Sequence, residues 1–507
     1  MFSVGRGFLA SVARGPDAIA LVDGDARWTY AEWLTMIGRF ASGLQALGIV
    51  RGDHLAVVAQ NRHEVATVYW ACQLTGIIMT PINWRATADE VNYVLEDAGA
   101  KAIVYELIAS EAVANSPAAQ SLPRIAIGKA PGATGYVDEW NALAPNDDWP
   151  AVGPDETSIM LYTSGTTGRG KGVPRSHAAE RAAGIAHVAQ NRYAVSESTL
   201  GVMPLYHTMG VRSLIAMSLI NGNFVCLPRF DVEAALRLIE LEAITTLYLV
   251  PTLYHDLIHH DAFPNTDIRS VRKLGFAGAP MTDALVRDLN DAFEPELFVN
   301  HYGSSEIYTF TIEQSAYARP GSAGRAGINQ EIRVVALGSG DPSRQNPDGV
   351  EGEIIASLHG DESFAGYWRR PDADERALID GWYFTGDTGY FDADGNLFVT
   401  GRVDDMIISG GENISPVEIE SVLSLHPSVD EVAVVGLADE RWGQRVTAFI
   451  KRGSMVSDDE LETHCLKSTL PAFKRPREYI FVAEIPKSPV GKILRRLLVS
   501  GEFVREG

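Results

Sequence analysis

Residues 162–172 have the composition of a loop that binds a chain of phosphates. Within this segment lie four Gly, four Ser or Thr hydroxyls and Lys171. The glycines expose backbone N–H groups, the hydroxyls add short donors, and the lysine adds a positive charge. Because a β-rich run (158–162) precedes the loop, we expect it to follow a strand and not to be a flexible linker.

Two features separate this loop from a Walker A motif, although residues 165–171 match G-x-x-x-x-G-K. Gly172 stands where a Walker loop supplies the Ser or Thr hydroxyl that binds Mg²⁺. Pro174 disfavours the helix that such a loop opens. We therefore expect a phosphate loop of a different kind.

Four other segments carry charged or aromatic side chains that suit a phosphate-bearing ligand. Glu306 ends Tyr-Gly-Ser-Ser-Glu (302–306), and a carboxylate beside a phosphate needs a cation between them. The other three are Tyr-Phe-Thr-Gly-Asp (383–387), Gly-Arg-Val-Asp-Asp (401–405) and Pro-Lys-Ser-Pro-Val-Gly-Lys-Ile (486–493). Each one alone also reads as an ordinary polar turn, so their joint occurrence carries the argument.

Together these segments resemble the signature motifs of the adenylate-forming superfamily, which includes acyl- and aryl-CoA synthetases, luciferases and peptide-synthetase adenylation domains. The resemblance covers essentially the whole chain. Gly170 is a departure, because the family usually has Pro there.

The resemblance implies a site for ATP or AMP. Tyr302 would pack on the adenine, Asp387 would take the ribose hydroxyls, and Glu306 would hold Mg²⁺ as the metal ligand. The nucleotide-binding residues implied are Thr163, Ser164, Gly165, Thr166, Thr167, Gly168, Lys171, Gly278, Ala279, Pro280, Tyr302, Gly303, Ser305, Asp387 and Arg402.

The same resemblance implies three catalytic residues and a hinge. Lys492 would neutralise charge between the substrate carboxylate and the α-phosphate. His207, in Met-Pro-Leu-Tyr-His (203–207), would orient or gate the acyl group. Glu306 completes the set through its cation, and Asp404 would absorb the backbone rotation between two domains.

Residues 203–207, 401–414, 437–448 and 473–476 are most similar to the 4-chlorobenzoate type of aryl-CoA ligase. This implies CoA contacts at Gly410, Gly411, Trp442, Phe473, Arg475 and Arg477. It also implies an acyl pocket lined by Ile185, His207, Thr208, Met209, Leu249, Ile307 and Phe310. Residues 182–185 are smaller than in the chlorobenzoate enzymes. Arg181 and His187 are expected at the surface, with contact to a second polar group of the substrate as the alternative.

The hydrophobic pattern predicts α/β layers that position these motifs. Strands are expected at 55–59, 247–250, 273–276 and 297–300, with the 277–280 and 302–306 loops at strand ends, where open α/β sheets bind ligands. We expect a large N-terminal adenylation domain (1–403) of stacked sheets with helices and a β-subdomain. A hinge joins it to a small, mobile α+β C-terminal domain (404–507), whose first helix begins with a capping box at Ser415 and Glu418. Residues 109–135 are expected to form a surface excursion.

Composition narrows the classes of function. The 507 residues carry 43 Lys and Arg against 65 Asp and Glu, a formal charge of −22, which disfavours nucleic acid and anionic lipid surfaces as partners. Three widely spaced cysteines fit a reducing cytoplasm. We expect no membrane span, and an amphipathic first helix within 1–14 in place of a signal peptide.

These observations predict an ATP-dependent carboxylic acid–CoA ligase that uses ATP, CoA and Mg²⁺ and acts on an aromatic or other compact, medium-length apolar acid. Two alternatives stay open: a stand-alone adenylation enzyme that loads a carrier protein, and a medium-chain fatty acyl-CoA synthetase. A nucleotide-binding protein without activity is disfavoured by the joint presence of Glu306, Asp387 and Lys492. The acid, the pathway and the oligomeric state, with a homodimer as one option, are left open.

Overall fold

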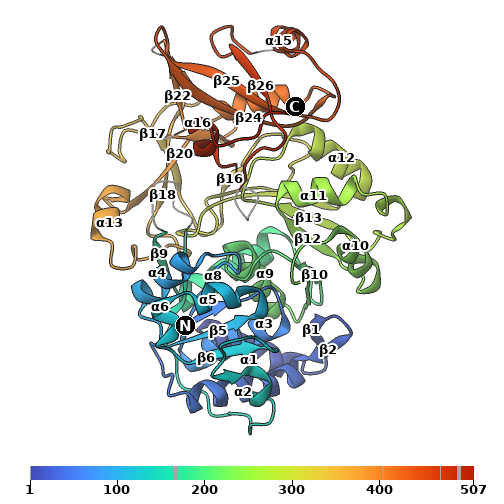
Figure 1. Ribbon diagram of the computed structural model, residues 1–507, viewed down its shortest axis with the longest axis vertical. Helices are drawn as coiled ribbons and strands as arrows, with labels where there is room; N and C mark the ends of the chain where they lie inside the picture. The colour runs from blue at the N-terminus through green and yellow to red at the C-terminus, as the bar shows by residue number, and fades with distance from the viewer. Residues whose placement is uncertain are drawn as a thin grey trace.

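The computed structural model describes residues 2–163, 170–403, 405–410, 412–468, 470–487 and 493–506. Its strands form four sheets, two large ones in the N-terminal part and two smaller ones towards the C-terminus (Figure 1). This arrangement confirms the predicted α/β class with stacked sheets, a β-subdomain and a C-terminal domain.

The first large sheet has seven strands. Its parallel strands are covered on one face by α4 (Ala88–Ala98), α5 (Ser110–Ala114) and α6 (Pro117–Gln120). In spatial order the strands are β7 (Gly135–Tyr136), β6 (Arg124–Ile127), β5 (Ala102–Glu106), β3 (His54–Val58), β4 (Ile78–Pro81), β8 (Thr157–Tyr162) and β9 (Gly172–Ser176).

The second large sheet has nine strands. Its outer face packs on α10 (Val232–Leu241), α11 (Pro251–Ile258) and α12 (Asp283–Phe293). In order the strands are β16 (Arg325–Ala326), β15 (Thr311–Glu313), β14 (Leu297–Tyr302), β13 (Lys273–Phe276), β12 (Thr246–Leu249), β10 (Ser198–Gly201), β11 (Asn223–Cys226), β1 (Ile19–Asp23) and β2 (Ala26–Thr29).

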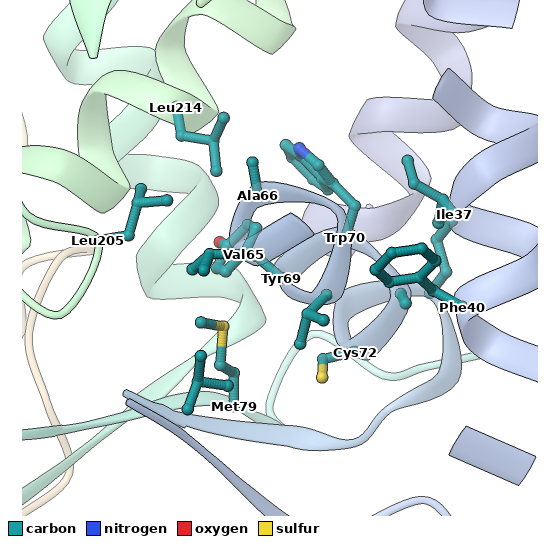
Figure 2. Close-up of a cluster of buried hydrophobic side chains, with 14 of the residues drawn as sticks. Ile37, Phe40, Val65, Ala66, Tyr69, Trp70, Cys72, Met79, Leu205 and Leu214 are labelled. Atoms are coloured by element: carbon teal, nitrogen blue, oxygen red, sulfur yellow. The ribbon is translucent and has the colours of Figure 1, made fainter. Parts of the chain in front are cut away.

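The two large sheets pack against helices that are buried on nearly every side. All residues from 64 to 74 of α3 (His63–Thr75) are buried, as are residues 208–218 of α9 (Thr208–Leu219). A helix that is apolar all round belongs inside a large core. One core cluster therefore joins strands of both sheets to α2 (Tyr30–Ala46), α3, α8 (His177–Gln190) and α9; Figure 2 shows Tyr69 and Trp70 of α3 within it.

The predicted strand ends carry the motif loops. Parallel pairing of β12, β13 and β14 brings their carboxyl ends to one edge. β13 ends at Phe276, directly before the 277–280 loop, and Thr282 then caps α12 by accepting from the Leu285 N–H (3.3 Å). β14 ends at Tyr302, where the Tyr-Gly-Ser-Ser-Glu turn begins.

Two five-stranded sheets complete the chain. The subdomain sheet contains β17 (Ile332–Val335), β18 (Gly352–Ser357), β19 (Leu378–Ile379), β20 (Trp382–Phe391) and β21 (Leu397–Arg402), with α13 (Pro371–Ala377) beside it. The C-terminal sheet contains β22 (Ile407–Ser409), β23 (Glu412–Ile414), β24 (Val429–Asp439), β25 (Gly443–Arg452) and β26 (Glu478–Phe481), with α14 (Pro416–Leu423), α15 (Asp458–Lys467) and α16 (Arg495–Val499). The predicted domain boundary at 403/404 falls between β21 and β22.

Two local predictions are wrong. Residues 109–135 are not a surface excursion, because β6 within them pairs in parallel with β5 and buries Ile125 and Ile127. The predicted start of α14 is confirmed, with Ser415 as its N-cap residue and Pro416 in its first turn, but the predicted capping box is absent because the Ser415 side chain makes no capping hydrogen bond. Its hydroxyl donates to the carbonyl of Thr400 on β21, and Glu418 pairs with Lys474 (2.5 Å).

The predicted first helix is confirmed as α1 (Val4–Arg14), which buries Val4, Phe8 and Val12 at helical spacing. Phe8 stacks on Trp70, with ring centroids 4.4 Å apart, and meets Trp33 edge-on. A short α7 (Val137–Trp140) packs on α2. Among the described residues, no helix is long and apolar enough to span a membrane.

We predict that Phe8→Ala lowers the free energy of unfolding of this core by about 3–5 kcal/mol, because it leaves a cavity between two tryptophans. Urea unfolding followed by tryptophan fluorescence measures the change. Phe2→Ala removes the same ring from an exposed position and should cost less than about 0.5 kcal/mol. Equal losses in both variants would show that the Phe8 ring is not part of the core.

Candidate active site

The predicted phosphate loop joins two antiparallel strands, β8 and β9. Its ends are closed by the Thr163 N–H, which donates to the carbonyl of Lys171 (3.1 Å). A side chain at Gly170 would place its Cβ 2.5 Å from the Thr163 carbonyl oxygen, so this backbone requires glycine or a local shift. A strand follows the loop where a Walker motif would open a helix. The predicted binding residues Ser164, Gly165, Thr166, Thr167 and Gly168 lie outside the described residues.

Asp387 joins three of the predicted motifs. Its Oδ2 accepts a hydrogen bond from the Tyr302 hydroxyl (2.6 Å), and its Oδ1 accepts one from Arg402 Nη1 (2.6 Å). Asp387 and Arg402 are directly opposite each other in the antiparallel pair β20–β21, which explains the ion pair. Burial and the neighbouring Asp387 carboxylate raise the pKa of Tyr302 well above its usual value, so its hydroxyl stays protonated.

Glu306 is held by a tight turn. The Ser304 N–H donates to the Ile307 carbonyl (2.9 Å), and Ser304 Oγ accepts from the Glu306 N–H (3.2 Å). A Cβ at Gly303 would lie 2.1 Å from the Tyr308 carbonyl oxygen, so the turn requires glycine there. The Glu306 carboxylate is buried and accepts from the Tyr367 hydroxyl (2.7 Å). Ser305 lies in the same turn, half-buried.

Lys171 lies beside Tyr367, the residue that donates to the Glu306 carboxylate. Its Nζ lies 3.9 Å from the centroid of the Tyr367 ring, so Tyr367 contacts both the cation and the Glu306 carboxylate. Burial lowers the pKa of Lys171, and Glu306 only partly offsets this. The site therefore holds a lysine that loses its charge more readily than one in water.

His207 occupies the N-cap of α9. Its Nδ1 accepts from the Met209 N–H (3.3 Å), which leaves Nε2 as the protonated nitrogen. Asn61 fixes the preceding segment, because its amide donates to the Met203 carbonyl (2.6 Å) and accepts from the Leu205 N–H (2.9 Å).

The predicted acyl-pocket residues fall into two groups. Buried residues of α9, β12 and the turn after β14 are Thr208, Met209, Leu249, Ile307 and Phe310. Met209 and Val250 are the side chains nearest to Gly278, whose φ is +86°, so these residues reach the 277–280 loop that also contains Ala279 and Pro280. The prediction for Ile185 is wrong, because it is exposed on α8 in a groove against α1, lined also by Phe2.

His187 also differs from its prediction. It is buried between Tyr248 and His301, with ring centroids 4.8 and 5.1 Å away. Burial holds its pKa well below the usual value, so the ring is neutral. The surface expectation failed because α8 lies between the two sheets.

Part of the predicted CoA surface comes together in the C-terminal domain. The Gly410 N–H donates to the Trp442 carbonyl (2.8 Å), and a Cβ at Gly410 would lie 3.1 Å from the indole. The Arg477 guanidinium lies over the same indole, with its central carbon 4.3 Å from the ring centroid. Phe473 is exposed, and Arg475 Nε donates to the Leu470 carbonyl (3.2 Å). Gly411, the predicted hinge residue Asp404 and the predicted catalytic residue Lys492 lie outside the described residues.

Sequence reasoning missed Tyr367, although it contacts both Lys171 and Glu306. It also missed Arg175 and Arg212, two buried arginines that bind the backbone around Glu306. No spacing in the sequence pairs these residues, because Arg175 and Glu306 are 131 positions apart.

The fold and the convergence of these motifs define an adenylate-forming enzyme. The chain belongs to the AMP-binding enzyme family. The model of that family matches residues 8–368, and the model of the AMP-binding enzyme C-terminal domain matches residues 418–492.

Individual proteins in the family are similar over nearly the whole chain. The 4-chlorobenzoate–CoA ligase of Arthrobacter sp is 33% identical over 494 residues, which cover 96% of this chain and 93% of that protein. A long-chain-fatty-acid–CoA ligase of Mycobacterium tuberculosis is 32% identical over 478 residues, covering 94% and 93%. The ATP-bound structure of MatB from Rhodopseudomonas palustris has a TM-score of 0.89 at 27% identity and covers 99% of both chains.

We predict that the affinity for ATP falls with rising pH, and begins to fall below the pH at which an ordinary lysine loses its charge, because burial lowers the pKa of Lys171. The sign follows from the ligand, since the polyanion binds the protonated lysine. Calorimetric titration at a series of pH values measures the effect.

Lys171→Arg keeps the charge as the pH rises and should flatten the profile. A profile with the same slope in the Lys171→Arg variant would exclude Lys171 as the titrating group.

Proposed function

We propose that this protein is an ATP-dependent, AMP-forming carboxylic acid–CoA ligase that works through an acyl-adenylate. The observation that carries the proposal is that the Asp387 carboxylate binds both Tyr302 and Arg402, close to Glu306 and Lys171. Membership of the AMP-binding enzyme family and the CoA-ligase relatives support the same reaction.

In the first half-reaction, a substrate carboxylate oxygen would attack the α-phosphorus of ATP, and the bond to the β-phosphate would break to release pyrophosphate. The chain's part is to position the two reactants and to offset charge. Lys171 and the loop N–H groups would bind the phosphates, and Lys492 would neutralise charge between the carboxylate and the α-phosphate. His207 would orient the acid at the start of α9.

Glu306 is the residue that would hold Mg²⁺. A buried carboxylate is a hard oxygen ligand of the kind Mg²⁺ prefers, and phosphate oxygens supply further ligands. When bound, the ion neutralises phosphate charge. The hydrogen bond from Tyr367 restricts the direction in which the carboxylate points.

In the second half-reaction, the CoA thiol sulfur would attack the acyl carbon and AMP would leave. We assign residues 1–403 and 404–507 to two domains, with rotation about Asp404 between the half-reactions. The rotation would withdraw Lys492 and present the surface formed by Gly410, Gly411 and Trp442. Phe473, Arg475 and Arg477 would bind the nucleotide end of CoA.

The substrate is proposed to be an aromatic or other compact, medium-length apolar acid. The buried residues around His207 are mostly apolar, and one relative acts on 4-chlorobenzoate. A medium-chain fatty acid remains the alternative, which the fatty-acid relative supports. A cytoplasmic location is proposed on the basis of three buried, free cysteines. A homodimer stays a prediction.

We predict pyrophosphate release with at least one member of a panel of aromatic, alicyclic and short- to medium-chain acids, in the presence of ATP and CoA. Activity confined to fatty acids would favour the alternative substrate class. Absence of release with every acid would contradict the ligase assignment.

For the two-state cycle, we predict that Lys492→Ala loses adenylation by about 100-fold or more, because its charge acts only in that step. Thiolysis of supplied acyl-adenylate should remain within about threefold of the parent rate. Single-turnover assays separate the two rates. Equal loss in both half-reactions would contradict the rotation.

The thiol acceptor is tested by Arg475→Ala. If CoA is the acceptor, the Michaelis constant for CoA should rise about tenfold, since one charged contact to its nucleotide is lost, while ATP–pyrophosphate exchange is unchanged. Absence of thioester formation with CoA in the parent enzyme would favour a carrier protein as the acceptor, whereas an unchanged constant for CoA in Arg475→Ala would remove Arg475 from the CoA site.

A further inference from the structure

Two buried arginines bind the backbone on either side of Ile307 in sequence, at Glu306 and at Tyr308. Arg175, on β9, donates from Nη1 to the carbonyls of Glu306 (2.7 Å) and Glu362 (2.5 Å). Arg212, on α9, donates from Nη1 to the carbonyl of Tyr308 (3.0 Å) and to Thr309 Oγ1 (2.8 Å). These contacts leave the backbone of the loop after β14 little freedom to shift.

Each arginine comes from an element that also carries a predicted site residue. Arg175 follows Lys171 by four residues on the strand that leaves the phosphate loop. Arg212 lies one turn after Thr208 on α9, the helix capped by His207. Both the phosphate loop and the acyl side of the site are thereby connected to the Glu306 turn.

Arg175 also connects the two segments whose side chains meet at the site. It bridges the carbonyls of Glu306 and Glu362, and the Phe364 N–H donates to the same Glu306 carbonyl (3.1 Å). Tyr367, three residues further on, donates to the Glu306 carboxylate. A shift of either segment would therefore change the place and direction of this carboxylate.

The arrangement is costly for folding alone. Arg175 and Glu180 form an ion pair (2.9 Å) in which both side chains are fully buried. Replacing such a pair by apolar residues of similar volume is often neutral or stabilising. Stability therefore does not account for the pair, whereas a guanidinium that binds two carbonyls at once accounts for the position of the loop.

We propose that Arg175, aided by Arg212, is a positioning residue that aims the Glu306 carboxylate at the metal-bound phosphates. The inference rests on the proposed function, which assigns Glu306 to Mg²⁺. Arg175 touches no reacting atom and acts only through the turn. Glu180 keeps the guanidinium charged and oriented through its bond to Nε.

The test is the double variant Arg175→Met/Glu180→Leu, which removes both charges and leaves no buried ion unpaired. Mn²⁺ replaces Mg²⁺ as the probe, and its affinity in the presence of ATP is read from the electron paramagnetic resonance signal of free Mn²⁺. We expect the affinity to fall about tenfold or more, as for other residues that orient metal ligands. The Mg²⁺ concentration that gives half-maximal ATP–pyrophosphate exchange should rise in parallel. The maximal rate of this exchange should change less.

A matched control removes a buried ion pair elsewhere. Lys273 pairs with Glu197 and donates to the Arg192 carbonyl (2.8 Å), at the amino end of β13 and away from the motif loops. Lys273→Met/Glu197→Leu should leave the Mn²⁺ affinity within about twofold, whatever its effect on stability. Equal Mn²⁺ affinity in the parent and in Arg175→Met/Glu180→Leu would overturn the proposal.

Two further variants keep the outcomes separable. If the double variant does not fold, Arg175→Lys retains the charge but not the planar fork, and an unchanged Mn²⁺ affinity there would overturn the proposal. Glu306→Gln tests the assignment of Glu306 as the metal ligand, on which the proposal rests. Unchanged affinity in Glu306→Gln would remove the metal role of Glu306 and with it that part of the proposed function. Loss in Glu306→Gln without loss in the arginine variants would overturn only the positioning role.

Discussion

The site depends on one carboxylate that is shared between two sheets. Asp387 lies on β20 of the subdomain, opposite Arg402 on β21, and it also accepts from Tyr302 at the end of β14 in the nine-stranded sheet. Sheet register sets the contact between Asp387 and Arg402. The packing of the subdomain on the large domain sets the contact between Asp387 and Tyr302. Any change in how these units pack would separate motifs that are 85 residues apart in the chain.

A second constraint is the placement of positive side chains at the candidate site of an acidic protein. The overall charge is −22, yet Lys171, Arg175, Arg212 and Arg402 all lie on segments that form the candidate site or bind its backbone. Two of these, Arg175 and Arg212, are buried and bind backbone oxygens, so they shape the site without facing solvent. Lys171 and Arg402 are only partly buried and remain accessible to a ligand. The net charge of the chain therefore does not describe the charge at the candidate site.

Local patterns predicted much of the fold. β13 spans 273–276 as expected and Thr282 caps α12, because strand and helix signals there are short-range and strong. The pattern failed where tertiary packing decided the outcome. Residues 109–135 are rich in Ala, Pro and Gly and were expected to form a surface excursion, yet β6 within them lies in a sheet. The Ser415 hydroxyl bonds to β21 in place of its own helix.

The candidate site shows the same division. The resemblance to the signature motifs of the adenylate-forming superfamily identified Tyr302, Glu306, Asp387 and Arg402, and the structure brings Asp387 into contact with Tyr302 and Arg402. Ile185 was misplaced, because a one-residue shift on α8 moves a side chain from the buried face to the groove against α1. Tyr367 and Arg175 gave no signal, since their contacts with Glu306 span 61 and 131 positions. The roles of Ser164, Lys492 and Asp404 stay predictions.

The most direct test of the central claim follows an oxygen atom. With an acid that supports turnover, labelled with ¹⁸O in its carboxylate, the reaction is run with ATP and CoA and the nucleotide product is analysed by mass spectrometry. An acyl-adenylate intermediate transfers one carboxylate oxygen to phosphorus, so the account predicts AMP that carries one ¹⁸O atom. Unlabelled AMP, or ADP as the nucleotide product, would contradict it.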